Sequence, residues 1–232
     1  MAGAVVFDVG HTLVDYRNPL NWSALYGDAL KSMYRACGLE GTADKISRAS
    51  GVLSRYNTRI RPRREEVACE TIFQELLTET GDSPENLHRA IDAFFDFFQN
   101  GAVLFEDAKP TVMELKRRGL KLGVLTDVAY GMERPRALRD FQELLPWLDL
   151  WLTSVDVGFR KPSPEGFLRF SGAWKLAPGD LLYVGDEAKD ILGANEVGMG
   201  SVLLDRKHTG ADYGQRYTIH SLTELPALCG VE

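Results

Sequence analysis

The sequence predicts a doubly wound α/β fold: a Rossmann-like parallel sheet with helices on both faces, joined to a small all-helical cap. Three observations predict it. Short apolar runs recur along the chain, amphipathic helical segments separate them, and one long early stretch keeps helical periodicity without a strand. Strands that are buried on both faces read as continuous apolar runs, so their alternation with helices indicates a covered parallel sheet.

Five short apolar runs are the predicted strands. The first, at 4–8 (AVVFD), comes just before Gly10, which favours a tight turn. The second, at 121–126 (KLGVLT), follows a helical pattern closed by Gly119, which is the order of helix, glycine and strand in an α/β unit. The remaining runs lie at 148–154, 181–184 and 201–204.

The helical stretch at 17–101 interrupts this alternation and is the predicted cap, so residues 1–16 and 102–232 form the predicted core. Within it, the apolar cluster at 91–98 (IDAFFDFF) is expected to pack inside the cap. Breaks that divide the cap into four helices are predicted near 38–42, 61–62 and 81–84. The predicted hinge residues are Tyr16, Arg17, Gly101 and Ala102.

Composition excludes several classes of protein. With 232 residues, 44% of them hydrophobic and 26% charged, the chain has the balance of a globular protein. Its net charge of -6 gives no basic face for nucleic acid or for an anionic membrane. No apolar stretch is long enough to cross a bilayer and no signal peptide precedes the first strand, so we expect a cytoplasmic protein. Cys37, Cys69 and Cys229 are odd in number and widely spaced, which predicts neither disulfides nor a zinc site.

Polar residues follow four of the strands. Ligands of parallel α/β sheets bind beyond the carboxyl ends of the strands, so these residues are expected to form one site. The first strand ends in Asp8, which Gly10, His11 and Thr12 follow, and the second ends in Thr126 and Asp127. Lys161 follows the third strand, and Asp186 and Asp190 follow the fourth.

Four segments in this order, FDVGHTL, VLTD, RKPSPEGF and YVGDEAKDILGANEVGMG, resemble the four ordered motifs of the haloacid dehalogenase superfamily. The resemblance covers the core from Ala4 to Leu204. A helical cap between the first and second motifs is also similar to one subclass of that superfamily. The resemblance implies a hydrolase with an aspartate nucleophile, and it also implies that the hydroxyl of Thr12 fixes the turn after that nucleophile.

The chemistry of these residue types supports phosphoryl transfer. The carboxylate of Asp8 can attack phosphorus and form an aspartyl phosphate. Carboxylates and a backbone carbonyl are the hard oxygen ligands that Mg²⁺ prefers, and a cation would remove the repulsion between two anions. The ammonium group of Lys161 and the hydroxyl of Thr126 would stabilise charge on the transferred group. The candidate metal ligands are Asp8, Asp186 and the carbonyl of Gly10, with Asp190 nearby to order the metal's waters or to hold Lys161.

Each residue alone also has a structural explanation. An aspartate at a strand end is often a turn former, a lysine before proline is usually a solvated loop residue, and a threonine hydroxyl at a strand end is often structural. Only their joint occurrence at four strand ends favours a catalytic site.

One position departs from the superfamily pattern. Most of its phosphatases carry a second aspartate two residues after the nucleophile as general acid and base, and Gly10 stands there in this chain. His11 or Asp127 could substitute for it, although His11 is also explained as a residue that tolerates left-handed backbone. Alternatively the leaving group is good enough to depart without a proton, as in an acyl or aryl phosphate, or it is not an alcohol oxygen at all.

Three alternatives to a phosphatase are a dehalogenase, a phosphonoacetaldehyde hydrolase and a protein that only binds its ligand. Dehalogenases of the superfamily also lack the second aspartate but do not retain the acidic pair Asp186 and Asp190, whose charge would oppose attack by Asp8 in the absence of a cation. Phosphonoacetaldehyde hydrolases use a cap lysine, and Lys31 and Lys45 are the cap lysines here. A weakened protein that only binds a phosphorylated ligand is a further alternative.

Arginines gather in one part of the predicted cap. Arg59, Arg61, Arg63 and Arg64 surround Pro62. Guanidinium groups match carboxylates and phosphates, so Arg61 and Arg63 are candidates for binding a second anionic group of the substrate. A solvated basic loop explains the same pattern. Overall, the sequence predicts a magnesium-dependent phosphatase that acts on a small phosphorylated metabolite.

Overall fold

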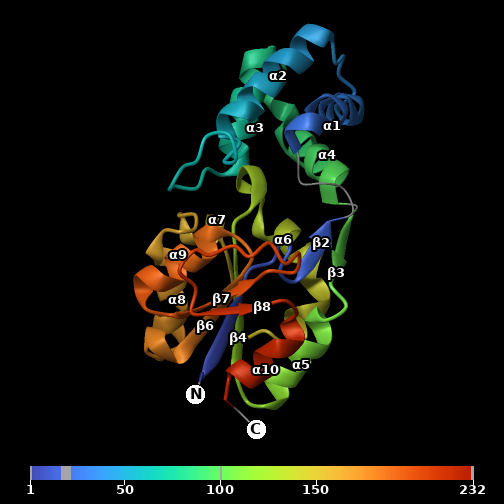
Figure 1. Cartoon of the computed structure of the whole chain (residues 1–232). Helices are drawn as coiled ribbons and strands as arrows, with labels where there is room; N and C mark the ends of the chain where they lie inside the picture. The colour runs from blue at the N-terminus through green and yellow to red at the C-terminus, as the bar shows by residue number, and fades with distance from the viewer. Residues whose placement is uncertain (1, 17–21, 100, 231–232) are drawn as a thin grey trace.

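A parallel sheet of six strands forms the centre of the protein. The computed structural model describes residues 2–16, 22–99 and 101–230 (Figure 1). The strand order is β5-β4-β1-β6-β7-β8, and every neighbouring pair is parallel. The strands are β1 (Ala4–Phe7), β4 (Lys121–Thr126), β5 (Leu150–Thr153), β6 (Leu181–Gly185), β7 (Gly200–Leu204) and β8 (Tyr217–Ile219). This confirms the predicted fold class. Of these six strands, β8 is the one that none of the five predicted runs contains.

Helices cover both faces of this sheet because successive side chains of a strand point to opposite sides. On one face Val5 and Phe7 pack with α5 (Ala108–Arg117), the 3₁₀ segment η3 (Leu138–Trp147) and α10 (Leu225–Leu228). On the other face Ala4 and Val6 pack with α8 (Pro164–Trp174) and α9 (Ala188–Val197). Shorter segments complete the core: η2 (Ala129–Gly131), α6 (Arg134–Ala137), α7 (Ser154–Val157), η4 (Pro178–Asp180) and η5 (Leu222–Glu224).

Four longer helices of the described residues lie above the carboxyl ends of the strands (Figure 1). The side chain of Thr42 caps the second of them by accepting a hydrogen bond from the backbone of Lys45, and Gly81 ends the third in the left-handed conformation (φ 72°). These helices are α1 (Trp22–Cys37), α2 (Ala43–Tyr56), α3 (Cys69–Thr80) and α4 (Leu87–Gln99), with η1 (Pro84–Asn86) before α4.

Two short antiparallel strands, β2 (Val14–Tyr16) and β3 (Ala102–Leu104), flank the helical region. Tyr16 pairs with Ala102 in this ladder. Two of the four predicted hinge residues therefore lie side by side. The division into a core and a cap at 17–101 stays a prediction, and Arg17 lies outside the described residues.

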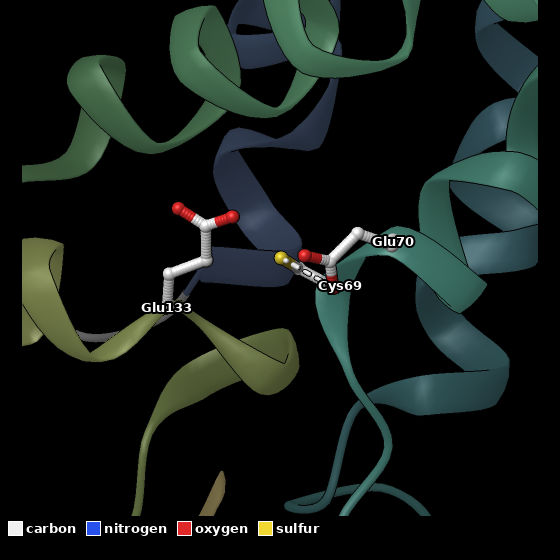
Figure 2. Close-up of side chains that lie close together, drawn as sticks. All are labelled: Cys69, Glu70 and Glu133. Atoms are coloured by element: carbon white, nitrogen blue, oxygen red, sulfur yellow. Dashed lines mark hydrogen bonds between the residues drawn. The ribbon is translucent and has the colours of Figure 1, made fainter.

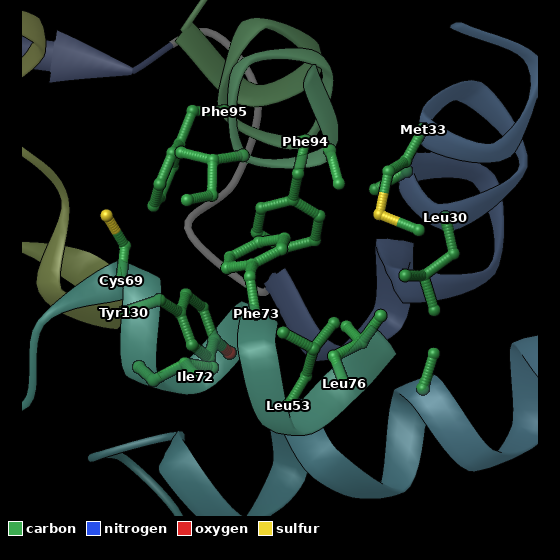
Figure 3. Close-up of a cluster of buried hydrophobic side chains, with 14 of the residues drawn as sticks. Leu30, Met33, Leu53, Cys69, Ile72, Phe73, Leu76, Phe94, Phe95 and Tyr130 are labelled. Atoms are coloured by element: carbon green, nitrogen blue, oxygen red, sulfur yellow. The ribbon is translucent and has the colours of Figure 1, made fainter. Parts of the chain in front are cut away.

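The core contacts the cap at several points. Cys69 and Glu70 at the start of α3 face Glu133 just before α6 (Figure 2). More deeply, Tyr130 of η2 packs among Ile72, Phe73 and Phe94 inside the cap (Figure 3). The loop that follows β4 therefore supplies part of the hydrophobic core of the cap.

Gly131 explains how the two parts approach so closely. Its φ of 62° is left-handed, and a Cβ atom there would come within 1.9 Å of the carbonyl oxygen of Val67 in the cap. A glycine is therefore required at this contact.

Candidate active site

Three neighbouring strands bring the predicted residues together. Asp8 follows β1, is 6% exposed, and is fixed by a hydrogen bond from its backbone nitrogen to the carbonyl of Val184 (2.8 Å). Thr126 is the last residue of β4, and Asp186 follows β6. Because β1 lies between β4 and β6, all three residues meet at one edge of the sheet.

Lys161 lies at the centre of this group. Its Nζ atom is 2.7 Å from Asp8 Oδ1 and 2.7 Å from Asp190 Oδ1, and its side chain is 2% exposed. Burial lowers the pKa of Lys161, but Asp190 and Asp8 outweigh burial and raise the pKa well above its ordinary value. The lysine is therefore a fixed positive charge beside the predicted nucleophile.

Asp190 fixes the position of the Lys161 ammonium group through its ion pair with it. Its Oδ2 atom accepts a hydrogen bond from the backbone nitrogen of Glu187 (3.0 Å), and the residue is completely buried. Tyr183, which the sequence analysis did not single out, accepts a further hydrogen bond from Lys161 (3.1 Å). Gly185 makes room for this arrangement, because a Cβ atom there would lie 2.3 Å from Asp190 Cγ.

Three carboxylates form a group that fits a cation. One oxygen atom from each of Asp8, Asp186 and Asp190 lies within 4.8 Å of the others. Burial, together with the charges of Asp8 and Asp190, raises the pKa of Asp186, so the ionised form needs a positive partner. Thr12 is fully buried, and its hydroxyl donates to Asp186 Oδ1 (3.4 Å). An oxygen donor set of this kind suits Mg²⁺.

Asp127 is held by positive groups on several sides. Its Oδ1 atom accepts a hydrogen bond from the backbone of Lys161 (3.1 Å), and Oδ2 lies 3.2 Å from Lys189 and 3.8 Å from Arg160. Burial raises its pKa, but Lys161, Lys189 and Arg160 outweigh burial and lower it overall. Asp127 therefore stays ionised and is poorly suited to donate a proton.

Gly10 and His11 form the turn after Asp8. His11 is left-handed (φ 55°), and its backbone nitrogen donates to the carbonyl of Val14 (2.7 Å). The His11 side chain is 41% exposed, with Nδ1 3.9 Å from Asp15. The structural explanation of this histidine, tolerance of a left-handed turn, matches the conformation observed.

A cavity of about 810 Å³ lies over these residues, between core and cap. Asp8, Thr126 and Lys161 line its floor. Trp22 and Phe98, stacked with ring centroids 4.0 Å apart, line its cap side. The volume exceeds what a phosphoryl group needs and leaves room for an organic part of the substrate.

A known family of hydrolases matches most of this chain. The model of the haloacid dehalogenase-like hydrolases matches residues 2–198. The chain belongs to this family of hydrolases. A phosphoserine phosphatase of Thermus thermophilus is 33% identical over 138 residues, which are 59% of this chain and 54% of that protein. A glyceraldehyde 3-phosphate phosphatase of Methanopyrus kandleri is 29% identical over 217 residues, 89% of this chain and 85% of that protein.

Solved structures of the family share the fold. A 2-haloacid dehalogenase from Pseudomonas syringae superposes with a TM-score of 0.71 at 24% identity, and the alignment covers 99% of each chain. A HAD phosphatase from Thermococcus onnurineus gives a TM-score of 0.66 at 25% identity over 100% of this chain and 99% of the other. Among its described residues, this haloacid dehalogenase-like hydrolase has no helix long and apolar enough to cross a membrane.

The cap arginines of this hydrolase occupy different positions. Arg59 and Arg63 line the cavity, whereas Arg61 is exposed and does not line it. Arg59 pairs with Glu187 (3.1 Å), and Arg63 pairs with Glu66 (3.0 Å). Both lining arginines therefore already have carboxylate partners.

The loop between α2 and α3 is also tied to the core beside Lys161. Glu66 forms a buried ion pair with Arg160 and accepts a hydrogen bond from the hydroxyl of Ser154 (2.6 Å). The backbone nitrogen of Arg160 donates to the carbonyl of Arg64 (2.8 Å). Sequence reasoning missed this connection because its partners are about ninety residues apart, and only the position of Arg160 next to Lys161 hinted at it.

A second group of possible metal ligands, Cys69, Glu70 and Glu133, lies at the contact between cap and core (Figure 2). The thiol of Cys69 donates to Glu70 (3.4 Å), and burial raises its pKa to about 12. A thiol binds a metal as its thiolate, so a protonated Cys69 is a poor ligand. We assign this group to packing.

Proposed function

We propose that this hydrolase is a magnesium-dependent phosphatase that acts on a small phosphorylated metabolite through an aspartyl phosphate on Asp8. The observation that carries the proposal is the buried ion pair between Lys161 and Asp8, whose atoms lie 2.7 Å apart. Beside it lie the carboxylates of Asp186 and Asp190, which together with that of Asp8 could hold a cation. The phosphatase names of two relatives support the same reaction type.

The residues of the chain suit each step of this reaction. Asp8 is held by its backbone at the floor of the cavity, so one carboxylate oxygen can form the bond to phosphorus while the bond to the leaving oxygen breaks. Lys161 carries a fixed charge that offsets the negative charge of the transferred group. Thr126 lines the same floor, where its hydroxyl can donate to a phosphoryl oxygen.

The cation would be held by Asp8, Asp186 and the carbonyl of Gly10, with Asp190 behind them fixing Lys161. When bound, Mg²⁺ would neutralise the carboxylates and the phosphate that must approach one another. Dehalogenation is less well supported, because Asp186 and Asp190 would then stand uncompensated near the nucleophile.

The residues that line the cavity indicate which organic groups a substrate could carry. Trp22 and Phe98 of the cap and Met132 of the loop after β4 give the cavity apolar surface, and the two cap arginines that line it are paired with carboxylates. We therefore propose a phosphate ester whose organic part is uncharged. A second substrate anion, as the arginine hypothesis requires, would have to displace Glu66 from Arg63.

An imine mechanism is also less well supported. Lys31 pairs with Asp28 on the surface, and Lys45 pairs with Asp82. Neither lysine lines the cavity.

Hydrolysis of 4-nitrophenyl phosphate with magnesium, with a chelator and by Asp8→Asn protein tests the proposal. Turnover that needs magnesium and disappears in Asp8→Asn is expected. Turnover that survives in folded Asp8→Asn protein would contradict the proposal.

A comparison of two substrates tests whether the organic part is uncharged. Phenyl phosphate should be hydrolysed with a higher kcat/KM than phosphoglycolate. A preference for phosphoglycolate that is lost in the double variant Arg61→Met, Arg63→Met would instead establish these arginines as anion-binding residues.

A further inference from the structure

Tyr16 lies where the superfamily's second aspartate would project. Residue 10 is a glycine, and a Cβ atom built on it would point toward Tyr16, 3.6 Å from Cε2 of its ring. Tyr16 also lines the cavity, together with Asp8. The space beside the nucleophile that a carboxylate would use is therefore bordered by a phenol.

Asp140 stands behind Tyr16. The Tyr16 hydroxyl donates a hydrogen bond to Asp140 Oδ2 (3.1 Å), and Gln99 Nε2 donates to Asp140 Oδ1 (3.3 Å). The three residues come from β2, η3 and α4, and all of them line the cavity. The hydrogen bonds thus link the phenol to a half-buried carboxyl group at the wall of the cavity.

Burial favours the protonated forms of both Asp140 and Tyr16. Burial raises the pKa of Asp140 more than its hydrogen bonds to Tyr16 and Gln99 lower it. Burial and the neighbouring Asp140 raise the pKa of Tyr16 well above its ordinary value, so the phenol keeps its proton. When Asp140 takes up a proton, the direction of the hydrogen bond reverses: Asp140 donates to the phenol oxygen, and the phenol hydrogen is free for another acceptor.

The two residues that the sequence offered as substitutes are less suitable. Asp127 is surrounded by Lys161, Lys189 and Arg160, which favour its ionised form. His11 is partly exposed, and its ring makes an edge contact with Tyr16 (centroids 6.1 Å apart) rather than a hydrogen bond to a second buried group.

We propose that Tyr16 and Asp140 together replace the missing second aspartate as the proton donor and acceptor of the reaction. This rests on the proposed function. As the bond between phosphorus and the leaving oxygen breaks, its electron pair takes the Tyr16 proton, and Tyr16 takes the proton of Asp140. Asp8 is then phosphorylated and Asp140 is ionised.

The second half of the reaction returns Asp8 to a free carboxylate and Asp140 to its protonated form. Water attacks the phosphorus of the aspartyl phosphate, and the bond from phosphorus to Asp8 breaks. The proton of that water passes through Tyr16 to Asp140, so the net reaction consumes one ester and one water and yields one alcohol and one phosphate. Tyr16 is the catalytic residue of the pair, and Asp140 acts through it.

The test uses three esters whose leaving oxygens become progressively more basic: 4-nitrophenyl, phenyl and benzyl phosphate. General acid catalysis contributes about 10²–10⁴-fold and matters most for basic leaving groups. Tyr16→Phe and Asp140→Asn should therefore lose about 10²-fold or more of kcat on benzyl phosphate while losing far less on 4-nitrophenyl phosphate. Tyr34→Phe removes another buried hydroxyl, outside the cavity, and should change none of the three rates.

Other outcomes would overturn the pairing. An equal loss on all three esters, in variants whose thermal unfolding is unchanged, would show that the pair only positions the site, and no loss would show that it is not used. A selective loss in His11→Gln but not in Tyr16→Phe would assign the role to His11. Absence of turnover by the unaltered protein on every ester would overturn the proposed function and the pair together, whereas magnesium-dependent turnover with unselective variants would overturn the pair alone.

Discussion

The ammonium nitrogen of Lys161 lies 2.7 Å from a carboxylate oxygen of Asp8, and both side chains are almost completely buried. Asp190 holds the same nitrogen from the other side at 2.7 Å. The predicted nucleophile therefore stands beside a positive charge whose position the protein fixes before any substrate enters.

Replacing this lysine should remove the electrostatic stabilisation. Lys161→Met leaves Asp8 and Asp190 without their shared partner, and we expect kcat to fall by about 10²–10³-fold, as for loss of one preorganised donor. Steady-state kinetics with 4-nitrophenyl phosphate measure this. Lys121→Met, at an exposed position on β4, is the control and should retain full activity. An unchanged kcat in Lys161→Met would contradict the assigned role.

The substitution Gly10→Asp would place a carboxylate where most phosphatases of the superfamily have their second aspartate. The space at Gly10 admits a Cβ at ordinary contact distance from Tyr16, and the φ of Gly10 is not left-handed. In protein that already carries Asp140→Asn, the further change Gly10→Asp should restore part of the lost rate on benzyl phosphate. Gly10→Asn, which has the same shape without the acid, should not. Equal rates in the two double variants would argue against a missing proton donor.

The buried pair of Glu66 and Arg160 should stabilise the docking of the α2–α3 loop. Glu66→Gln leaves the buried guanidinium group of Arg160 with only the more distant carboxylate of Asp127 (3.8 Å), and breaking a buried pair costs about 3–5 kcal/mol. Urea unfolding measures the loss. Glu165→Gln breaks the more exposed pair with Arg64 across the same contact and should cost only about 0–1 kcal/mol. Equal costs would show that burial does not set the strength of this contact.

The raised pKa of Asp140 predicts a dependence of stability on pH. Between the unfolded value of about 3.9 and the higher folded value, the folded protein binds more protons than the unfolded chain, so ionisation of Asp140 destabilises the fold as pH rises. Asp140→Asn removes this loss. The unfolding free energy of the variant relative to the unaltered protein should therefore increase as the pH rises above about 4, measured by urea unfolding at several pH values. A relative stability that decreases as the pH rises would contradict a raised pKa of Asp140.

Much of the sheet follows directly from the sequence, and so do the positions of the strand-end residues. The continuous apolar runs that became β1, β4 and β6 identify buried strands, and the order of a parallel sheet brings Asp8, Thr126 and Asp186 to one edge. The short strands β2, β3 and β8 have three residues each, too few to show a period.

Long-range contacts account for what the sequence could not predict. Tyr130 reads as a loop residue, yet it packs inside the cap because Gly131 allows close approach of the two parts. Tyr16 and Asp140 are 124 positions apart and belong to no common motif. Their pairing depends on where β2 and η3 lie in the folded chain.

The central claim is that Asp8 becomes phosphorylated. The most direct measurement is mass spectrometry of protein quenched in acid during turnover of acetyl phosphate with magnesium, followed by peptide mapping. The account predicts one added phosphoryl group on the peptide that contains Asp8, absent with chelator and absent in Asp8→Asn. Rapid turnover with no phosphorylated peptide in quenches taken throughout the reaction, or a phosphoryl group on another residue, would contradict it.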